Sequence, residues 1–287
     1  MSHETCAWDP GALGGADRAK VVAELCSSDQ HRMRTRSLLE GLVLRTGDRV
    51  LEVGCGSGEV LLELSRRRPA DVTLVGVDTD RNALAIAQHA ARALADISIR
   101  RMDGRALEFA DGHFDLVCFS RVLTHASNPK LLLSEASRVL RPGGQAVCIE
   151  PVIAFATGID DELRRRVHGQ RHPCIGRDLP PLLQAAGLAP RRMALHTFVD
   201  SKPRDGSELW REFCDGTGLH ALARRAHHCT AEDFARYLEA RQRALDSGCF
   251  FESVVHAGIF AEKLDPRSDS PCPHSPPLSS TIYSNGL

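Results

Sequence analysis

The chain has 287 residues, of which 43% are hydrophobic and 25% are charged, so it is long enough to bury a sizeable core and has the composition of a globular protein. Its 36 basic and 37 acidic residues give a net charge of -1, without the basic excess that is typical of a dedicated nucleic-acid binder. The longest apolar runs have the length of a strand and are too short to span a bilayer.

The first half of the chain alternates short apolar runs with amphipathic helical patterns. Strands that alternate with helices of this length predict a parallel sheet covered by helices on both faces. In chain order we expect a helix at 28–44, an apolar run at 49–56, a helix at 59–67, a strand at 73–78, a helix at 81–95, strands at 97–103 and 114–122, a helix at 131–140 and a strand at 145–151.

The second half of the chain has a different pattern. Residues 151–178 are irregular to helical, and the helix that follows them ends at Gly187. Two strand patterns, 190–200 and 250–264, enclose two polar helical stretches, and we expect these strands to form an antiparallel edge of the sheet. The segment from Pro266 is rich in proline and serine with little apolar content, which predicts a disordered tail.

Ten cysteines raise the question of disulfides or a metal site. No two of them form a CxxC pair, and the first residues of the chain lack the apolar core of a signal peptide. We therefore expect reduced thiols, no metal site and a cytoplasmic protein.

The strongest local signal is the sequence VLEVGCGSG at 50–58, in which a strand runs into three glycines at alternate positions. Glycine permits a tight turn and lets a ligand approach the backbone. A plain strand-to-helix turn is the alternative, because glycine-rich turns are common. The fingerprint for a nicotinamide cofactor would need a third glycine at the position that Glu59 occupies.

Acidic residues accompany three successive strands of this pattern. Glu52 lies on the strand before the glycines, Asp78 ends the next strand, and Asp103 ends the one after it. In doubly wound sheets, an acidic residue at the second of these positions reaches a ribose diol. A single aspartate there is usually a helix cap. Three acids in register with a glycine loop predict one ligand crevice at the carboxyl ends of the strands.

Four segments together resemble class I S-adenosylmethionine-dependent methyltransferases, in particular the broad group of ubiquinone/menaquinone-type and small-molecule enzymes. The resemblance covers about residues 35–151 in the family's order and spacing, and it is specific for the cofactor and the fold rather than for the substrate. It implies an α/β, doubly wound, Rossmann-like fold with a mostly parallel seven-stranded sheet, an antiparallel edge strand and a helical cap. The matching segments are VLEVGCGSG, LVGVDTDRNAL, RRMDGRALEFADGHFDLVCFSRVLTH and EASRVLRPGGQAVCIEP.

The resemblance also implies which positions bind S-adenosylmethionine (SAM). The three glycines would pack against its methionine and ribose, Glu52 would hold the ammonium directly or through water, and Asp78 would bond both ribose hydroxyls. Asp103 and the neighbouring backbone would read the adenine amine, and Ser120 would lie near the sulfonium. Thr79 stands where the family often has an apolar residue that packs on adenine, and Met102 would supply part of that contact. The implied cofactor positions are Glu52, Gly54, Cys55, Gly56, Gly58, Asp78, Thr79, Met102, Asp103, Gly104 and Ser120.

His125, just past the fourth strand, is the candidate catalytic base, because an imidazole suits proton transfer near neutral pH. The alternative is a structural histidine at the start of a helix. Several aromatic and histidine side chains of the second half are candidate substrate contacts, and their alternative role is the core of the cap. They are Phe155, His168, His172, Trp210, Phe213, Phe234 and Tyr237.

We divide the chain into an N-terminal lid segment (1–34), a methyltransferase domain (35–265) that contains a helical cap insertion (205–248), and a disordered tail (266–287). The leading hypothesis is methyl transfer from SAM to a small organic acceptor in specialised, natural-product metabolism, with no nucleic-acid or membrane partner.

Two other functions compete with this hypothesis. Methylation of RNA or protein is opposed by the neutral charge and by Ser120-Arg121-Val122-Leu123, where amino-group methyltransferases have Asn-Pro-Pro-Tyr. A cyclase, or a regulatory protein that binds SAM without transferring its methyl group, is the third possibility, because a fold does not fix a function.

Overall fold

The computed structural model describes residues 23, 29–94, 96–168, 170–200, 206, 209, 229–265 and 279–283. The described strands are β1 (Arg49–Val53), β2 (Thr73–Asp78), β3 (Ile97–Arg101), β4 (Phe114–Ser120), β5 (Leu140–Ala156), β6 (Leu188–Asp200), β7 (Glu252–Lys263) and β8 (Ser279–Tyr283). The described helices are α2 (Asp29–Leu38), α3 (Glu59–Ser65), α4 (Arg81–Ala91), α5 (Pro129–Val139), α6 (Asp161–His168), the 3-10 turn η1 (Ile175–Arg177), α7 (Leu179–Ala185) and α10 (Ala231–Asp246).

All described strands belong to one sheet in the order β3-β2-β1-β4-β5-β7-β6-β8. Strands β1 to β5 are parallel, and β7 is antiparallel to both β5 and β6. The prediction of a doubly wound, mostly parallel seven-stranded sheet with an antiparallel strand is therefore confirmed by β1–β7. The order reverses between β1 and β4, and ligands of such sheets bind at the carboxyl ends of the strands beside this switch.

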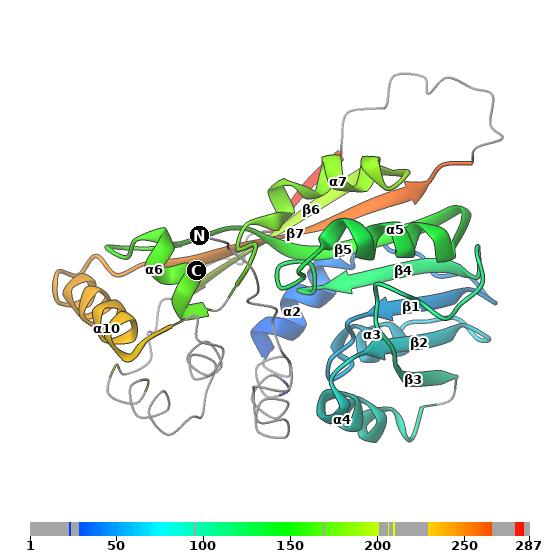
Figure 1. Ribbon diagram of the computed structural model, residues 1–287, viewed down its shortest axis with the longest axis horizontal. Helices are drawn as coiled ribbons and strands as arrows, with labels where there is room; N and C mark the ends of the chain where they lie inside the picture. Colours follow the sequence, from blue (N-terminus) through cyan, green and yellow to red (C-terminus); the bar gives the residue numbers. More distant parts are fainter. Residues whose placement is uncertain are drawn as a thin grey trace, which may run out of the picture.

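Helices cover both faces of the sheet, as Figure 1 shows. Apolar side chains of α2, α3 and α4 pack on one face with Leu74, Leu116 and Val147. The other face carries α5, η1 and α7, whose side chains join Leu51, Phe119 and Cys148 in a second cluster. Each strand therefore presents apolar side chains to both layers, which is why its sequence is a continuous apolar run rather than an alternating one.

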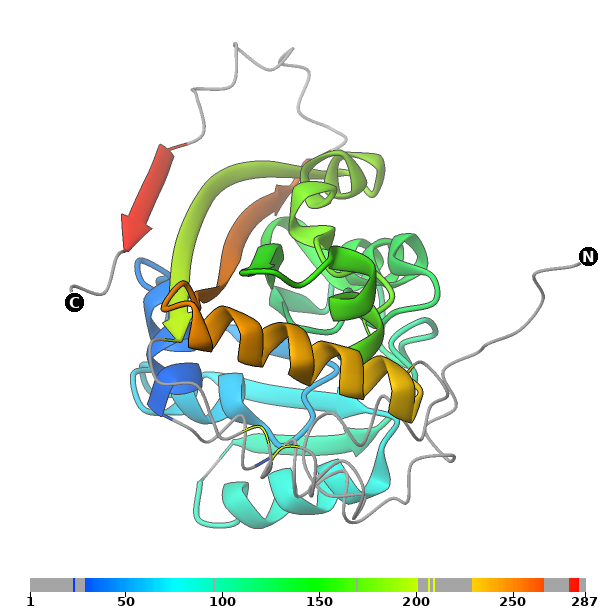
Figure 2. The ribbon, with the colours of Figure 1, turned by 90° about the vertical axis from the view of Figure 1, so that its left-hand side faces the viewer.

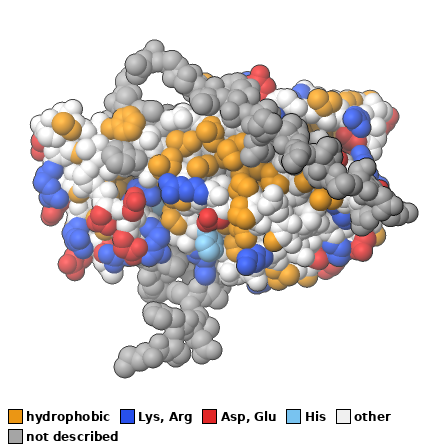
Figure 3. Space-filling view, turned by 90° about the horizontal axis from the view of Figure 1, so that it is seen from above, with side chains coloured by type: hydrophobic (Ala, Val, Ile, Leu, Met, Phe, Trp, Pro, Cys, Tyr) orange, Lys and Arg blue, Asp and Glu red, His pale blue; other side chains and the backbone are white. Residues whose placement is uncertain are grey.

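Helices α6 and α10 form a separate layer beyond the carboxyl end of β5, at the left of Figure 1. They share a small apolar cluster that includes Ala156, Val167 and Phe234. Thr230 caps α10 in a capping box with Asp233, and Asp233 also pairs with Arg166 of α6 at 3.0 Å. Seen from above, acidic and basic side chains gather at this end of the molecule (Figure 3).

The last described strand, β8, pairs in parallel with Arg192–His196 of β6 and lies along the outer side of that strand (Figure 2). It falls within the range for which the sequence predicts a disordered tail, whose other residues lie outside the described ones. Among the described residues, no helix has the length and apolar character needed to cross a bilayer.

Candidate functional site

The glycine loop begins where β1 leaves the sheet. The backbone N–H groups of Gly54 and Cys55 both donate to the carbonyl oxygen of Val77, at 2.8 and 3.0 Å, which fixes the loop to the end of β2. Gly54, Gly56 and Gly58 have φ values of 70°, 51° and 86°. These values lie in the left-handed region, where a side chain would be strained, so the loop conformation itself requires glycine at all three positions.

The surroundings of the three glycines differ. A Cβ on Gly54 would lie 2.4 Å from Cγ2 of Val122, and one on Gly58 would lie 3.4 Å from Cβ of Ala87. A Cβ on Gly56 would have no described atom within 4 Å. Gly54 and Gly58 therefore allow close packing inside the protein, whereas Gly56 keeps an open space at the carboxyl end of β1.

Asp78 bonds the loop at Gly56, and its negative charge acts on the buried carboxylate of Glu52. Glu52 is 2% exposed, and its Oε2 accepts a hydrogen bond from the backbone N–H of Leu61 at 3.2 Å. Burial raises the pKa of Glu52 well above its ordinary value, and the negative charges of Glu59 and Asp78 raise it further. Oδ2 of Asp78 accepts from the N–H of Gly56 at 2.9 Å. A positively charged ligand group beside Glu52 would relieve this repulsion.

Asp78 also tightens its own turn, because its Oδ1 accepts from the N–H of Asp80 at 2.9 Å. Each carboxylate oxygen has two lone pairs, so both oxygens of Asp78 keep one for a further donor. Asp80 rather than Asp78 is the helix cap: its Oδ1 accepts from Asn82 and Ala83 at the start of α4. The capping role that the sequence left open for Asp78 is therefore carried out by Asp80.

The residues after β3 line the same edge of the sheet. Asp103 is paired with Arg105, with Nη2 and Oδ2 2.7 Å apart, and this guanidinium holds the pKa of Asp103 below its ordinary value. Sδ of Met102 accepts from the N–H of Glu108, and Thr79 is exposed with its carbonyl bonded to Arg101. A Cβ on Gly104 would lie 2.5 Å from Val53, so glycine is needed there for packing.

Two further predicted cofactor positions, Cys55 and Ser120, differ in how far their side chains are buried. Cys55 is 4% exposed, and a Cβ on Gly76 would lie 2.9 Å from its sulfur, so its side chain packs into the sheet and only its backbone faces the loop. Ser120 is the last residue of β4 and is half-buried. It pairs with Ile149 of β5 at the carboxyl edge, next to the switch in strand order.

The turn after β4 is held by a residue that the sequence analysis did not single out. Glu150 is fully buried, and its carboxylate accepts from the backbone N–H groups of Val122, Leu123 and Thr124 at 2.9, 2.8 and 3.2 Å. Burial raises its pKa to about 7 in spite of these donors. The sequence did contain a signal for this residue, because Glu150 stands at the end of a strand pattern, as Asp78 does.

His125 follows this turn, and its backbone N–H bonds to the carbonyl of Val122. His172 comes from a distant segment and docks on the same turn. Its carbonyl accepts from Oγ1 of Thr124 at 2.9 Å, and its Nε2 lies 3.2 Å from the carbonyl oxygen of Ala126. The structure therefore brings the predicted residues His125 and His172 into one neighbourhood.

The predicted aromatic contacts of the cap lie elsewhere. Phe234 and Tyr237 of α10 are 0% and 2% exposed, stack on each other at 5.9 Å, and belong to the apolar cluster between α6 and α10. His168 meets Tyr237 edge to face at 6.3 Å. This is the alternative that the sequence left open, namely the core of the cap. The side chain of Phe155, and all of Trp210 and Phe213, lie outside the described residues.

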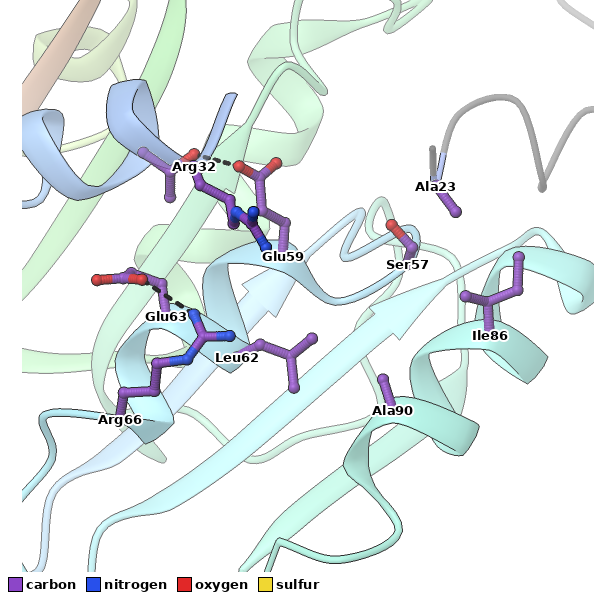
Figure 4. Close-up of a pocket in the computed structure, with 10 residues that line it drawn as sticks. Ala23, Arg32, Ser57, Glu59, Leu62, Glu63, Arg66, Ile86 and Ala90 are labelled. Carbon is purple, nitrogen blue, oxygen red and sulfur yellow. Dashed lines mark hydrogen bonds and ion pairs between the residues drawn. The ribbon is translucent and has the colours of Figure 1, made fainter. Parts of the chain in front are cut away.

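A cavity of about 350 Å³ lies among α2, α3 and α4, on the outer side of the glycine loop (Figure 4). Thr35, Leu62 and Ile86 line it, and Ser57 is its contribution from the loop. Figure 4 shows Glu59 and Glu63 at its side, with Glu63 bonded to Arg66. Glu59 accepts a hydrogen bond from Oγ1 of Thr35. None of Glu52, Asp78, Asp103 or Ser120 lines this cavity, so it is distinct from the strand-end site.

Part of the chain is similar in sequence to known methyltransferases. Residues 51–148 match the family model for a methyltransferase domain. The chain is 28% identical over 126 residues to a demethylmenaquinone methyltransferase of Staphylococcus carnosus, a match that covers 44% of this chain and 52% of that protein. The chain spans about half or less of the length of the curated relatives that it matches.

Solved structures share the fold at low sequence identity. The YcgJ protein of Bacillus subtilis has a TM-score of 0.59 at 16% identity, over 82% of this chain and 100% of that one. The [4+2]-cyclase SpnF has a TM-score of 0.54 at 22% identity, over 83% of this chain and 85% of that one. The solved structures of a Haemonchus contortus N-methyltransferase (TM-score 0.55 at 16% identity) and of this cyclase therefore both share the fold.

Proposed function

We propose that the protein transfers the methyl group of SAM to a small organic acceptor, because residues 51–148 match the family model for a methyltransferase domain. The observation that carries the proposal is the open space at Gly56, where Asp78 bonds the loop, together with the buried carboxylate of Glu52, on which the charge of Asp78 acts. A glycine loop with acidic residues at successive strand ends fits a ligand with an ammonium group and a ribose diol.

The donor set fits SAM group by group. Glu52 would hold the methionine ammonium, whose positive charge offsets the repulsion among Glu52, Glu59 and Asp78. The free lone pairs of Asp78 would accept from the two ribose hydroxyls. Asp103 and Met102 follow β3 on the side of the sheet where the adenine would lie. The remaining cofactor positions would contribute backbone or packing rather than side-chain bonds.

When bound, SAM supplies a sulfonium methyl group that is already activated and has a neutral leaving group. The residues of this chain then have three tasks: to orient the acceptor in line with the methyl, to exclude water, and to remove a proton where the acceptor carries one. Ser120 ends β4 at the position expected for the sulfonium. His125 follows the turn that Glu150 holds, and it is our candidate for the base that removes the proton from the acceptor.

The acceptor side would be closed by the cap of α6 and α10, which lies beyond the carboxyl end of β5 (Figures 1 and 2), and by α2, which packs on the face of the sheet that carries Leu116. The demethylmenaquinone methyltransferase relative and the absence of a basic excess in the sequence both favour a small organic acceptor. Within that class we propose a role in specialised, natural-product metabolism.

The cofactor assignment is tested by calorimetry with SAM and with its demethylated product, using Asp78→Ala. This variant loses two hydrogen bonds that the ribose hydroxyls would donate to a charged group, each worth about 1.5–3 kcal/mol, so the Kd should rise more than tenfold. Asp80→Ala is the matched control. It removes the cap of α4 and should cost about 0.5–2 kcal/mol of stability while the Kd changes by less than about threefold.

No heat of binding with either ligand, or equal affinities of the Asp78→Ala variant and the unaltered protein, would contradict the cofactor assignment. Methyl transfer itself is tested with methyl-labelled SAM and a panel of phenols, quinones and amines. Binding of SAM without label transfer to any of them would favour the cyclase or regulatory alternative.

A further inference from the structure

The cavity of Figure 4 lies among the helices that cover one face of the sheet. None of the described residues that we assign to the cofactor or to the acceptor lines it. Its volume is about 350 Å³. Ligand sites in proteins commonly enclose about 300–1,000 Å³, and an apolar cavity of about 150 Å³ is already large enough to bind benzene. The cavity therefore has room for a molecule of about two rings.

The wall of the cavity is apolar between α3 and α4. Figure 4 shows Leu62 of α3 extending toward Ile86 and Ala90 of α4. Ile86 and Ala90 are four residues apart and therefore lie on the same face of their helix. Ala23, from the N-terminal part of the chain, adds a further apolar side chain. A ligand that covers these side chains would remove apolar surface from water, which favours binding.

The described lining also includes four charged side chains, two basic and two acidic, and each of them has a partner. The pairs are Arg32 with Asp29, Arg66 with Glu63, and Glu59 with both Arg34 and Thr35. These charges sum to zero and are already compensated, so a charged ligand would lose its hydration without gaining a free partner. Among the described residues, no group of three or more His, Cys, Asp and Glu side chains could hold a metal ion. The lining therefore favours a neutral ligand.

Ser57 is the polar residue of the described lining whose side chain makes no hydrogen bond to another described residue. It is half-buried, and Figure 4 shows it at the edge of the cavity above Ala90. A hydroxyl group can donate one hydrogen bond and accept others. Small-molecule sites typically combine apolar walls with a few polar groups that fix the orientation of the ligand. Ser57 would fulfil that role for a ligand with one hydrogen-bonding atom.

Ser57 also places the cavity next to the cofactor site. It follows Gly56, which keeps the open space at the carboxyl end of β1, and it belongs to the same glycine loop. The strand-end site and the cavity therefore adjoin different residues of one loop. The cofactor and a ligand in the cavity would be bound side by side and not in competition.

We propose that this cavity is a second binding site, for a small neutral molecule of about two rings that is largely apolar and carries one hydrogen-bonding group. The inference goes beyond the proposed function, because this ligand is neither SAM nor the methyl acceptor. Contact with Leu62, Ile86 and Ala90 supplies the affinity, and the Ser57 hydroxyl fixes the orientation.

The probe for this site is 1-indanone, which has two rings, no charge and a single carbonyl oxygen that can accept from Ser57. It would be titrated into the full chain with labelled isoleucine methyl groups. The NMR signal of Ile86, assigned with Ile86→Val, reports binding in the cavity. We expect a saturable shift with a Kd of about 1 mM or below, both for the free chain and for the chain saturated with S-adenosylhomocysteine, the demethylated product of SAM.

A charged analogue tests the expected ligand class. 1-Aminoindane has the same rings but is a cation at neutral pH, and it should bind at least about tenfold more weakly than 1-indanone. Ser57→Ala tests the hydrogen bond. It should weaken 1-indanone about three- to tenfold and leave indane, which lacks the carbonyl group, within about twofold.

Ala90→Phe tests the location of the site, because its ring would fill the cavity. It should weaken 1-indanone at least about tenfold and change the Kd for S-adenosylhomocysteine less than about threefold. Ala85→Phe is the matched control, because Ala85 is exposed on the same helix and is not part of the described lining. Its affinity for 1-indanone should stay within about twofold of the unaltered protein.

An Ile86 signal that does not shift, or equal affinities of the two phenylalanine variants for 1-indanone, would overturn the proposal. Equal binding of 1-aminoindane and 1-indanone would overturn it as well. Displacement of 1-indanone by S-adenosylhomocysteine, with weaker cofactor binding by Ala90→Phe, would assign the cavity to the cofactor. Circular dichroism checks folding, and Ser57→Ala decides if Ala90→Phe does not fold. If the unaltered protein binds no S-adenosylhomocysteine, the proposed function fails, while the titration of the free chain still tests the cavity.

Discussion

At the scale of single residues, the site is built from carboxylates with different tasks. Asp78 closes the glycine loop and keeps lone pairs for a ligand, and Asp80 caps a helix. Glu150 holds three successive backbone N–H groups after β4 and thereby fixes the turn that carries Arg121 and His125. The sequence shows that acidic residues stand at or near these strand ends. It does not show which carboxylates remain accessible to a ligand and which bond the backbone.

Glu150→Gln tests this positioning through its pH dependence. The folded-state pKa of Glu150 is about 7 against an ordinary value of 4.5, so between these values the folded protein keeps a proton that the unfolded chain has lost. The contribution of this group to the free energy of unfolding therefore falls as the pH rises through that window, by at most about 1.4 kcal/mol per pH unit. The variant does not titrate there.

Urea denaturation of both proteins from about pH 5 to about pH 8 would measure the effect. The stability difference between native protein and variant should shrink as the pH rises to about 7 and then stay constant. At every pH the variant should be less stable, because an amide group cannot accept all three backbone donors. A difference that does not depend on pH would show that Glu150 ionises normally.

At the scale of elements, α2 links α3 to the strand β6. Thr35 and Arg36 bond to Glu59 and Glu63 of α3, and Nη2 of Arg192 on β6 donates to the carbonyl of Glu40 just after the helix. The sequence predicts a helix to about residue 44, but α2 ends at Leu38. The turn that follows includes Gly41, whose φ of 76° a helix does not allow.

Gly258→Ala tests the docking of α2 on β7. The added Cβ would lie 2.9 Å from the carbonyl oxygen of Leu38, which is backbone and cannot rotate away. We expect a loss of about 1–3 kcal/mol in urea denaturation. Glu262→Ala, on an exposed part of the same strand, should change stability by less than about 0.5 kcal/mol. Equal effects of the two substitutions would show that α2 does not press on Gly258.

The cap is a second element-scale feature. Because α6 and α10 have an apolar cluster of their own, we propose that segment 205–248 is a lid rather than part of the core of the sheet. Replacing it with a short Gly/Ser linker should leave the Kd for SAM within about threefold and abolish turnover, because methyl transfer needs a dry site. Tyr237→Phe, which keeps the packing, is the control. Unfolding together with loss of SAM binding would show that the segment is core.

At the scale of the whole molecule, β8 adds a strand to the outer side of β6, at the end of the sheet opposite β3. A chain that ends at Arg267 would lack this strand and expose the edge of β6. The cofactor positions lie on β1 to β4, so we expect the Kd for SAM to stay within about twofold and the Tm to fall by no more than a few degrees, about 2–4 °C per kcal/mol lost. A large loss of SAM affinity would show that the tail supports the site.

The sequence by itself determined the glycine loop, the acidic strand ends and the alternation of strands and helices. These features are local, because they depend on φ angles, on strand-length apolar runs and on spacing along the chain. The tertiary structure alone decided the internal place of β7, the role of Glu150, the burial of Phe234 and Tyr237 in the cap, and the pairing of His196 with His256. Pairing of strands that are distant in sequence places His196 opposite His256, and no local pattern along the chain encodes that contact.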